Sequence, residues 1–156
     1  FVIEGSQFSL NFDGPNGLTA GYKFTVTPVT ECEEFTNFPG QSFQTLIPQV
    51  IESPEPYCNN MQVNQQYSFT NENVVRIDIA FTQLSLSDSE DYLVISSEDN
   101  SETSFTITMD VIDNISIPGK EFNLLFITGG EGTAEGFEFV ATPVTICDIL
   151  AASQGE

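Results

Sequence analysis

Two stretches of the chain share one pattern of apolar, turn and cysteine residues, and this repeat constrains the fold more than any other feature. Phe122, Leu124 and Phe126 occupy alternate positions, as in a strand with one buried face. Phe8, Leu10 and Phe12 show the same alternation 114 residues earlier. Further matches follow at a spacing of 115 residues: Gly21 and Gly136, Phe24 and Phe139, Thr27–Thr30 and Thr142–Thr145, and Cys32 and Cys147. The chain therefore contains a repeat of domain length.

Each copy of this pattern predicts a β-hairpin. In the second copy a glycine-rich segment, residues 128–133, separates the strand that begins at Phe122 from the strand that begins at Gly136. Glycine adopts the positive φ angles that tight turns need. The first copy has a similar turn at residues 13–17. An isolated hairpin is marginally stable in water, so we expect the strands of residues 1–31 to complete a sandwich with material outside the following domain.

The composition limits the partners of the chain. Its 156 residues include 3 basic and 23 acidic residues, giving a formal net charge of −20. Binding to a phosphate backbone requires clustered Lys and Arg, so we expect no nucleic-acid partner. No run of 18 apolar residues occurs, so we also expect no membrane span. The 14 Phe residues are sufficient for a packed core.

The remaining segments predict short strands. Residues 75–81 and 105–111 alternate apolar and polar side chains, and residues 92–95 form a compact apolar run. No helical apolar period persists, and prolines interrupt residues 33–60. The predicted fold is all-β, a two-sheet antiparallel sandwich. Its expected core is Ile77, Ile79, Phe81, Leu93, Ile95, Phe105, Ile107, Phe122, Leu124, Phe126, Phe137 and Phe139.

The order of these segments resembles a CUB domain. The similar parts are Ile51-Glu-Ser-Pro54 with Tyr57 and Asn59-Asn60, the alternation from Ile77 to Leu86, the Asp91-Tyr92 strand, and the closing Phe122–Phe126 and Gly136–Phe139 segments. The resemblance implies a secreted, extracellular jelly-roll sandwich. It divides the chain into residues 1–31, the end of a preceding repeat; residues 32–147, the domain; and residues 148–156, a tail or the start of a following repeat. The family's Trp and its second disulfide have no counterpart here.

The three cysteines leave one without a partner. The resemblance implies a disulfide between Cys32 and Cys58, whose separation is close to that of the family's first disulfide. Cys147, the repeat equivalent of Cys32, is then expected to pair outside the chain, because an odd cysteine in a secreted protein indicates such a partner. The alternatives are a buried free thiol and a Cys58–Cys147 pair.

The resemblance also indicates a Ca²⁺ site. Family members that bind Ca²⁺ use three carboxylates, and Asp91 matches the second of them. Ser87 stands at the first position with Asp88 beside it, and Glu131 is the nearest carboxylate to the third. The alternative is an acidic, solvated turn at residues 88–91. No other cofactor is expected.

Two further features bear on function. Asn114-Ile-Ser116 is an N-glycosylation sequon at a predicted turn, and the alternative is an ordinary turn asparagine. The chain has no His, so it lacks an imidazole base and a Ser–His or Cys–His nucleophile pair. We therefore expect no enzymatic activity.

Two functional hypotheses remain. The first is a structural module, one unit of a tandem or filamentous extracellular array whose partners are neighbouring copies or adjacent repeats. The second is a receptor or adhesion domain that binds a protein or a glycan, with Ca²⁺ assisting. The internal repeat favours the first hypothesis.

Overall fold

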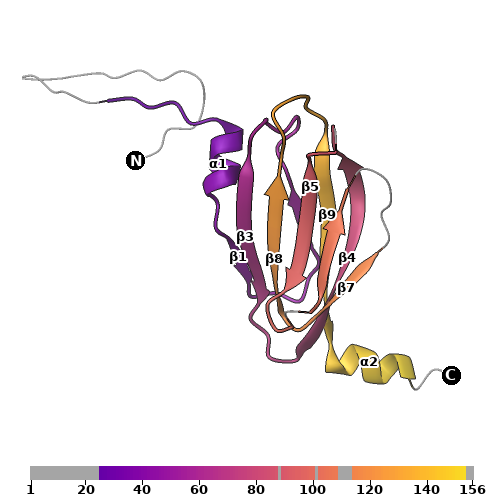
Figure 1. Cartoon of the computed structure of the whole chain (residues 1–156). Coiled ribbons are helices and arrows are strands. Elements are labelled where there is room, and N and C mark those ends of the chain that lie inside the picture. Colours follow the sequence, from indigo (N-terminus) through magenta and orange to yellow (C-terminus); the bar gives the residue numbers. More distant parts are fainter. Residues whose placement is uncertain (1–24, 88, 101, 109–113, 154–156) are drawn as a thin grey trace, which may run out of the picture.

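The computed structural model describes residues 25–87, 89–100, 102–108 and 114–153. Two short helices flank a β-sandwich (Figure 1). The helices are α1 (Glu31–Asn37) and α2 (Ile146–Ser153). The strands are β1 (Gly40–Phe43), β2 (Gln49–Glu52), β3 (Gln62–Phe69), β4 (Val74–Ser85), β5 (Tyr92–Ser97), β6 (Ser104–Ile107), β7 (Ile115–Pro118), β8 (Glu121–Ile127) and β9 (Gly136–Thr145).

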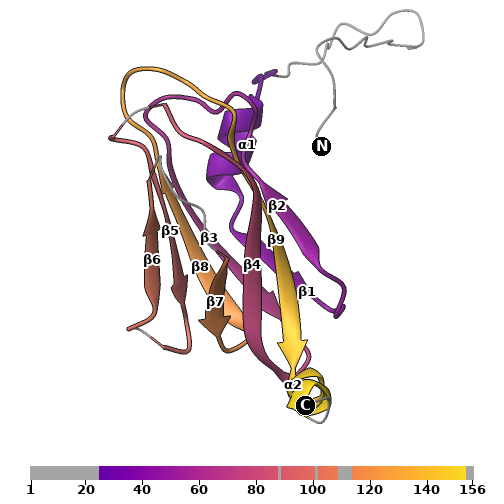
Figure 2. The ribbon, with the colours of Figure 1, turned by 90° about the vertical axis from the view of Figure 1, so that its right-hand side faces the viewer.

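The strands form two sheets that face each other (Figure 2). One sheet has the order β1-β3-β8-β5-β6, and the other has the order β2-β9-β4-β7. All described pairings are antiparallel except that of β1 with β3, which is parallel. The all-β sandwich expected from the sequence is therefore confirmed.

Alternation along the strands builds the core between the sheets. In β8 every second residue is buried, so Phe122, Leu124 and Phe126 point inward while their neighbours face outward. In β9 the rings of Phe137 and Phe139 meet them, and the Phe126 and Phe137 rings pack edge-on with centroids 5.2 Å apart. The expected core residues are buried, except that Phe81 and Phe105 are only partly buried at its margin.

The predicted hairpin of residues 122–139 is wrong. Strand β8 pairs with β3 and β5, whereas β9 pairs with β2 and β4 in the opposite sheet. The glycine-rich segment therefore crosses from one sheet to the other instead of turning within one. Strand β9 instead pairs with β4 along its whole length, with Val74 opposite Thr145 at one end and Ser85 opposite Gly136 at the other. The alternation was recognised correctly, but alternation alone does not identify a strand's partner.

The first copy of the repeat lies mostly outside the described residues, which begin at Thr25. Its expected hairpin at residues 1–31 is therefore not tested within residues 1–24. Residues 25–30 are described; they form no strand and are exposed, and they lead directly into α1.

Candidate functional site

Both helices begin with the same capping arrangement, 115 residues apart. At α1 the Thr30 hydroxyl accepts a hydrogen bond from the Glu33 amide, and the Glu33 carboxylate accepts one from the Thr30 amide at 2.9 Å. At α2 the Thr145 amide donates to the Asp148 carboxylate at 2.8 Å, and the Asp148 amide donates to the Thr145 hydroxyl at 3.3 Å. Each is a capping box, which pairs amides that a helix start would leave unpaired. The repeat therefore includes the two helices.

Hydrogen bonding in these caps lowers the pKa of two carboxyl groups. Bonds from the Thr30 amide and hydroxyl lower the pKa of the Glu33 carboxyl. Bonds from the Thr145 hydroxyl and amide lower the pKa of the Asp148 carboxyl. Both carboxylates are therefore charged at neutral pH, close to a helix N-terminus, where negative charge is favourable.

Helix α1 is fixed to the sandwich by three contacts. Cys32 forms a disulfide with Cys58, the pairing that the resemblance implied. The Phe35 ring packs against the Phe137 ring, with centroids 6.3 Å apart. The buried Gln65 side chain donates a 2.9 Å hydrogen bond to the Phe35 carbonyl. We call Cys58, Gln65 and Phe137 the α1 docking site.

Helix α2 continues from β9 and projects away from the sandwich at the end opposite α1 (Figures 1 and 2). Its residues are not buried, and the Cys147 thiol is free and exposed. The apolar side chains of Ile146, Ile149 and Leu150 are also exposed. The equivalent of the disulfide-bonded Cys32 is therefore open to solvent.

A buried hydrogen-bond cluster surrounds Asp91, which follows the β4–β5 turn. Its carboxylate accepts hydrogen bonds from the Tyr57 hydroxyl, the Ser87 hydroxyl at 2.8 Å and the Gly129 amide at 2.7 Å. Asp91 is 1% exposed. These donors come from three separate loops, so the carboxylate joins the segment before β3, the end of β4 and the β8–β9 connection.

The donors around Asp91 determine its protonation. Burial alone would raise the pKa of the carboxyl, but hydrogen bonds from Tyr57, Gly129 and Ser87 outweigh burial and lower the pKa. The pKa of the Tyr57 hydroxyl is raised, chiefly by burial and then by its hydrogen bond to Asp91. Asp91 is therefore an anion at neutral pH and Tyr57 is a neutral donor.

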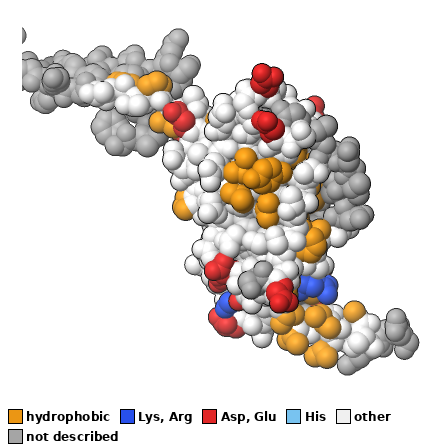
Figure 3. Space-filling model, viewed as in Figure 1, with side chains coloured by type: hydrophobic (Ala, Val, Ile, Leu, Met, Phe, Trp, Pro, Cys, Tyr) orange, Lys and Arg blue, Asp and Glu red, His pale blue; other side chains and the backbone are white. Residues whose placement is uncertain are grey.

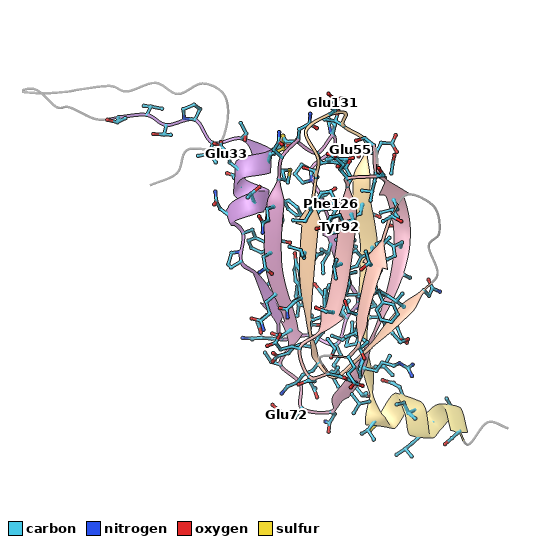
Figure 4. All side chains as sticks on the ribbon, viewed as in Figure 1. Glu33, Glu55, Glu72, Tyr92, Phe126 and Glu131 are labelled. Atoms are coloured by element: carbon cyan, nitrogen blue, oxygen red, sulfur yellow. A yellow bond between two sulfur atoms is a disulfide. The ribbon has the colours of Figure 1, made fainter. Side chains whose placement is uncertain are left out.

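The outer face of the five-stranded sheet carries an apolar patch. Tyr92 and Val94 of β5 lie beside Ile127 and Leu125 of β8, respectively, and all four side chains are half-buried. Figure 3 shows an apolar patch at the centre of the visible face, where Figure 4 labels Tyr92. A separate groove of about 310 Å³ lies between α1, β1 and β2, and Phe38, Phe43 and Val50 are part of its lining.

Comparison with known proteins shows what kind of domain these elements build. No protein-family model matches the chain, and no curated protein matches it. Among solved structures, the MASP-1 CUB2 domain bound to Ca²⁺ matches 66% of this chain and 97% of its own length, with 16% identity and a TM-score of 0.54. The described part of the chain has the CUB fold. The resemblance inferred from sequence is confirmed at that level.

Two longer structures contain the same CUB fold. The human MASP-1/3 CUB1-EGF-CUB2 structure covers 67% of this chain at 16% identity and a TM-score of 0.56, and 41% of its own length is matched. The full extracellular region of zebrafish Gpr126/Adgrg6 covers 69% of this chain at 12% identity and a TM-score of 0.56. Only 15% of that region is matched. These matches relate the fold of this chain to single domains within larger proteins.

The described residues of this CUB-like domain show no assembled Ca²⁺ site. Calcium takes about six to eight oxygen ligands. The Asp91 oxygens accept hydrogen bonds from three residues, Tyr57, Ser87 and Gly129. No cluster of three or more acidic, His or Cys side chains occurs among the described residues. Glu131 is exposed at the outer end of the β8–β9 connection (Figure 4). Asp88 lies outside the described residues.

The structure places the remaining sequence candidate at the surface. Asn114 is exposed and immediately precedes β7, and the hydroxyl of Ser116 in its sequon donates to Asp78 at 2.7 Å. Strand β7 is at the edge of its sheet. Within the helices and strands that the structure describes, no helix is both long and apolar enough to cross a membrane.

Sequence reasoning missed the helices and the α1 docking site. The spacing Thr30-x-x-Glu33 before a short segment is the signature of a capping box and could have revealed α1. Thr145-x-x-Asp148 gives the same signal for α2. Gln65 gave no signal, because a polar residue in an alternating strand is expected to face solvent.

Proposed function

We propose that this chain is a non-enzymatic extracellular structural module, one unit of a tandem or filamentous array of CUB-like domains. The supporting observation is the duplicated unit that leads from a Thr-Pro-Val-Thr segment into a capped helix with a cysteine at its second position. At residues 142–147 the first part of this unit is paired in β9 and its cysteine is free. At residues 27–32 the unit's cysteine is disulfide-bonded and its first part is exposed.

These two copies are complementary. The copy at residues 142–147 has its strand partner β4 but a free cysteine. The copy at residues 27–32 has its disulfide partner Cys58, but its first part is exposed and in no strand. A head-to-tail contact between copies would supply both, and such a heterologous contact extends without closing. Adjacent repeats within one polypeptide and neighbouring copies of the chain are both partners of this kind.

An extracellular location agrees with the disulfide, which persists in oxidising compartments. Non-enzymatic function agrees with the absence of His from the chain. It also agrees with the surroundings of Asp91, whose carboxylate accepts hydrogen bonds from three residues of its own domain. The acidic surface gives the copies mutual repulsion, which favours an extended arrangement over a compact aggregate.

Electron microscopy of native material tests the proposal. We expect linear strings or fibres with a regular repeat. Discrete, separate particles of single-domain size would contradict it.

A second candidate function is supported by the apolar patch of Tyr92, Val94, Leu125 and Ile127. Apolar patches bordered by polar groups are common at protein interaction sites, so this face is the candidate surface for a receptor or adhesion role. Substituting Val94 with Lys should abolish binding of a protein partner or glycan in that case. It should leave regular fibres intact in the first case, because the patch lies between the two ends of the sandwich that carry the helices (Figures 1 and 3).

A further inference from the structure

We propose that α2 is the first helix of a following CUB-like domain, and that it docks there through Cys147 and Leu150. This inference rests on the proposed array and specifies the contact between its units. The occupant is a second copy of the α1 docking site, supplied by the next repeat.

The residue correspondence identifies the docking face. With the repeat spacing of 115, Cys147 and Leu150 correspond to Cys32 and Phe35, the residues of α1 that contact the sandwich. Both positions are apolar or sulfur-bearing in α2, and Leu150 is 56% exposed. Leaving a large apolar side chain in water forgoes the free energy that burial would give.

The docking site has a partner for each of these groups. Cys58 of the next domain would form the disulfide with Cys147, as it does here with Cys32. The ring equivalent to Phe137 would pack on Leu150, and the Gln65 equivalent would donate to the Leu150 carbonyl. Gln65 is fully buried and also accepts a 2.8 Å bond from the Tyr67 hydroxyl, so its side chain is held in position.

The preceding domain holds the other end of α2. Thr145 pairs with Val74 at the end of β9, and the next residue, Ile146, donates its amide to the Asn73 carbonyl at 3.0 Å. Strand β9 and helix α2 are consecutive, with no residue between them. Two domains would therefore hold one continuous segment from both sides, so the junction has no free linker and is stiff.

The position of the helices makes such an array linear. Helices α1 and α2 lie at opposite ends of the sandwich (Figures 1 and 2). If α2 of one domain becomes α1 of the next, each domain is added at the end opposite its own attachment. The result is an extended rod of domains.

A tandem chain tests the docking. Residues 1–152 are followed directly by residues 38–156 of a second copy, so that α2 of the first copy takes the place of α1 in the second. This chain has five cysteines. We expect a disulfide between the first Cys147 and the second Cys58, found by peptide mapping, and therefore one free thiol per chain. Three free thiols would overturn the proposal.

Matched substitutions in the tandem chain test the face. Leu150→Glu in the first copy should greatly reduce formation of the new disulfide, because position 150 faces the docking site. Ile149→Glu should leave it unchanged, because its equivalent in α1, Glu34, is exposed. Equal effects of the two substitutions would contradict the assignment. If the second domain does not fold, Leu150→Phe restores the residue of α1, and failure of that variant also overturns the proposal.

Images of the tandem chain test the stiffness, and we expect a single narrow distribution of angles between the two domains. A broad distribution would contradict a junction without a linker. Failure of this inference differs from failure of the array. Fibres of native material with a free Cys147 would retain the array and reject the docking. Formation of the new disulfide in the tandem chain, with no fibres in native material, would retain the docking and reject the array.

Discussion

The Tyr57 hydroxyl donates a hydrogen bond to the Asp91 carboxylate, although the two residues are 34 positions apart in the chain. Tyr57 also accepts a 2.7 Å bond from the Ser87 amide, and its ring packs edge-on against Phe126 with centroids 5.4 Å apart. One side chain therefore connects the polar cluster to the aromatic core. The Asp91 carboxylate also accepts a hydrogen bond from the Gly129 amide in the β8–β9 connection.

We predict that Asp91→Asn destabilises the domain by about 1.5–3 kcal/mol at neutral pH, the range for hydrogen bonds to a charged group. The amide keeps the shape of the carboxylate but replaces one acceptor oxygen by a donor, which opposes the Tyr57 hydroxyl or the Gly129 amide. Urea unfolding measures the loss. Asp78→Asn is the control, since Asp78 pairs with Arg76 at the surface and such pairs contribute about 0–1 kcal/mol.

The lowered pKa of Asp91 predicts that the destabilisation caused by Asp91→Asn depends on pH. The folded domain lowers the pKa of Asp91 below its ordinary value of about 3.9. The charged carboxylate therefore stabilises the fold above that ordinary value, and this contribution disappears as the pH falls through the lowered folded pKa. The difference in unfolding free energy between wild type and Asp91→Asn should be larger at pH 7 than at pH 3. A constant difference would show that Asp91 acts without its charge.

The sequence predicted the fold class because alternation records which face of a strand is buried. Phe122, Leu124 and Phe126 had to share a face whatever the partner strand was. Pairing was less predictable: β8 and β9 are consecutive in the chain, but they lie in different sheets because β3 and β5 compete for β8. A short crossing and a tight turn both favour glycine, so the glycines of residues 129–132 could not distinguish them.

The site was predicted only in part for a similar reason. Asp91 could be found from a motif, but its role depends on which atoms surround it. The amide of Gly129 and the hydroxyls of Tyr57 and Ser87 come together only through tertiary structure. The sequence indicated Asp91 as one of three Ca²⁺ ligands but gave no sign of the hydrogen bonds that its carboxylate accepts in the folded domain.

Truncation of the core ring Phe126 should be costly. Phe126→Ala should destabilise the domain by about 3–5 kcal/mol, because Phe126 is fully buried between Tyr57 and Phe137. Phe105→Ala is the matched control: Phe105 lies on the edge strand β6 and is only partly buried, so its loss should be smaller. Thermal or urea unfolding of the two variants checks this, and an unchanged midpoint for Phe126→Ala would exclude it from the core.

Asn114 should carry a glycan in native material from a glycosylating source. Its side chain is exposed beside the edge strand β7, where a glycan would also shield the edge from pairing with another chain. Enzymatic deglycosylation should lower the intact mass, and Asn114→Gln should abolish the difference. An unchanged mass after the enzyme treatment of wild type would contradict the prediction.

The Cys32–Cys58 disulfide should contribute about 3 kcal/mol, since it closes a loop with a sequence separation of 26 residues. Cys58→Ala should lower the free energy of unfolding by that amount and should loosen α1 specifically, because the contacts of Phe35 and Gln65 alone then hold the helix. Amide hydrogen exchange would show the loss of protection in residues 31–37. Cys147→Ser is the control in the single chain, because its thiol is exposed and free, and substitutions at such positions usually stay within about 0.5 kcal/mol. Equal destabilisation by the two substitutions would mean that Cys147 already contributes to the fold of its own domain, contrary to its assignment to the next one.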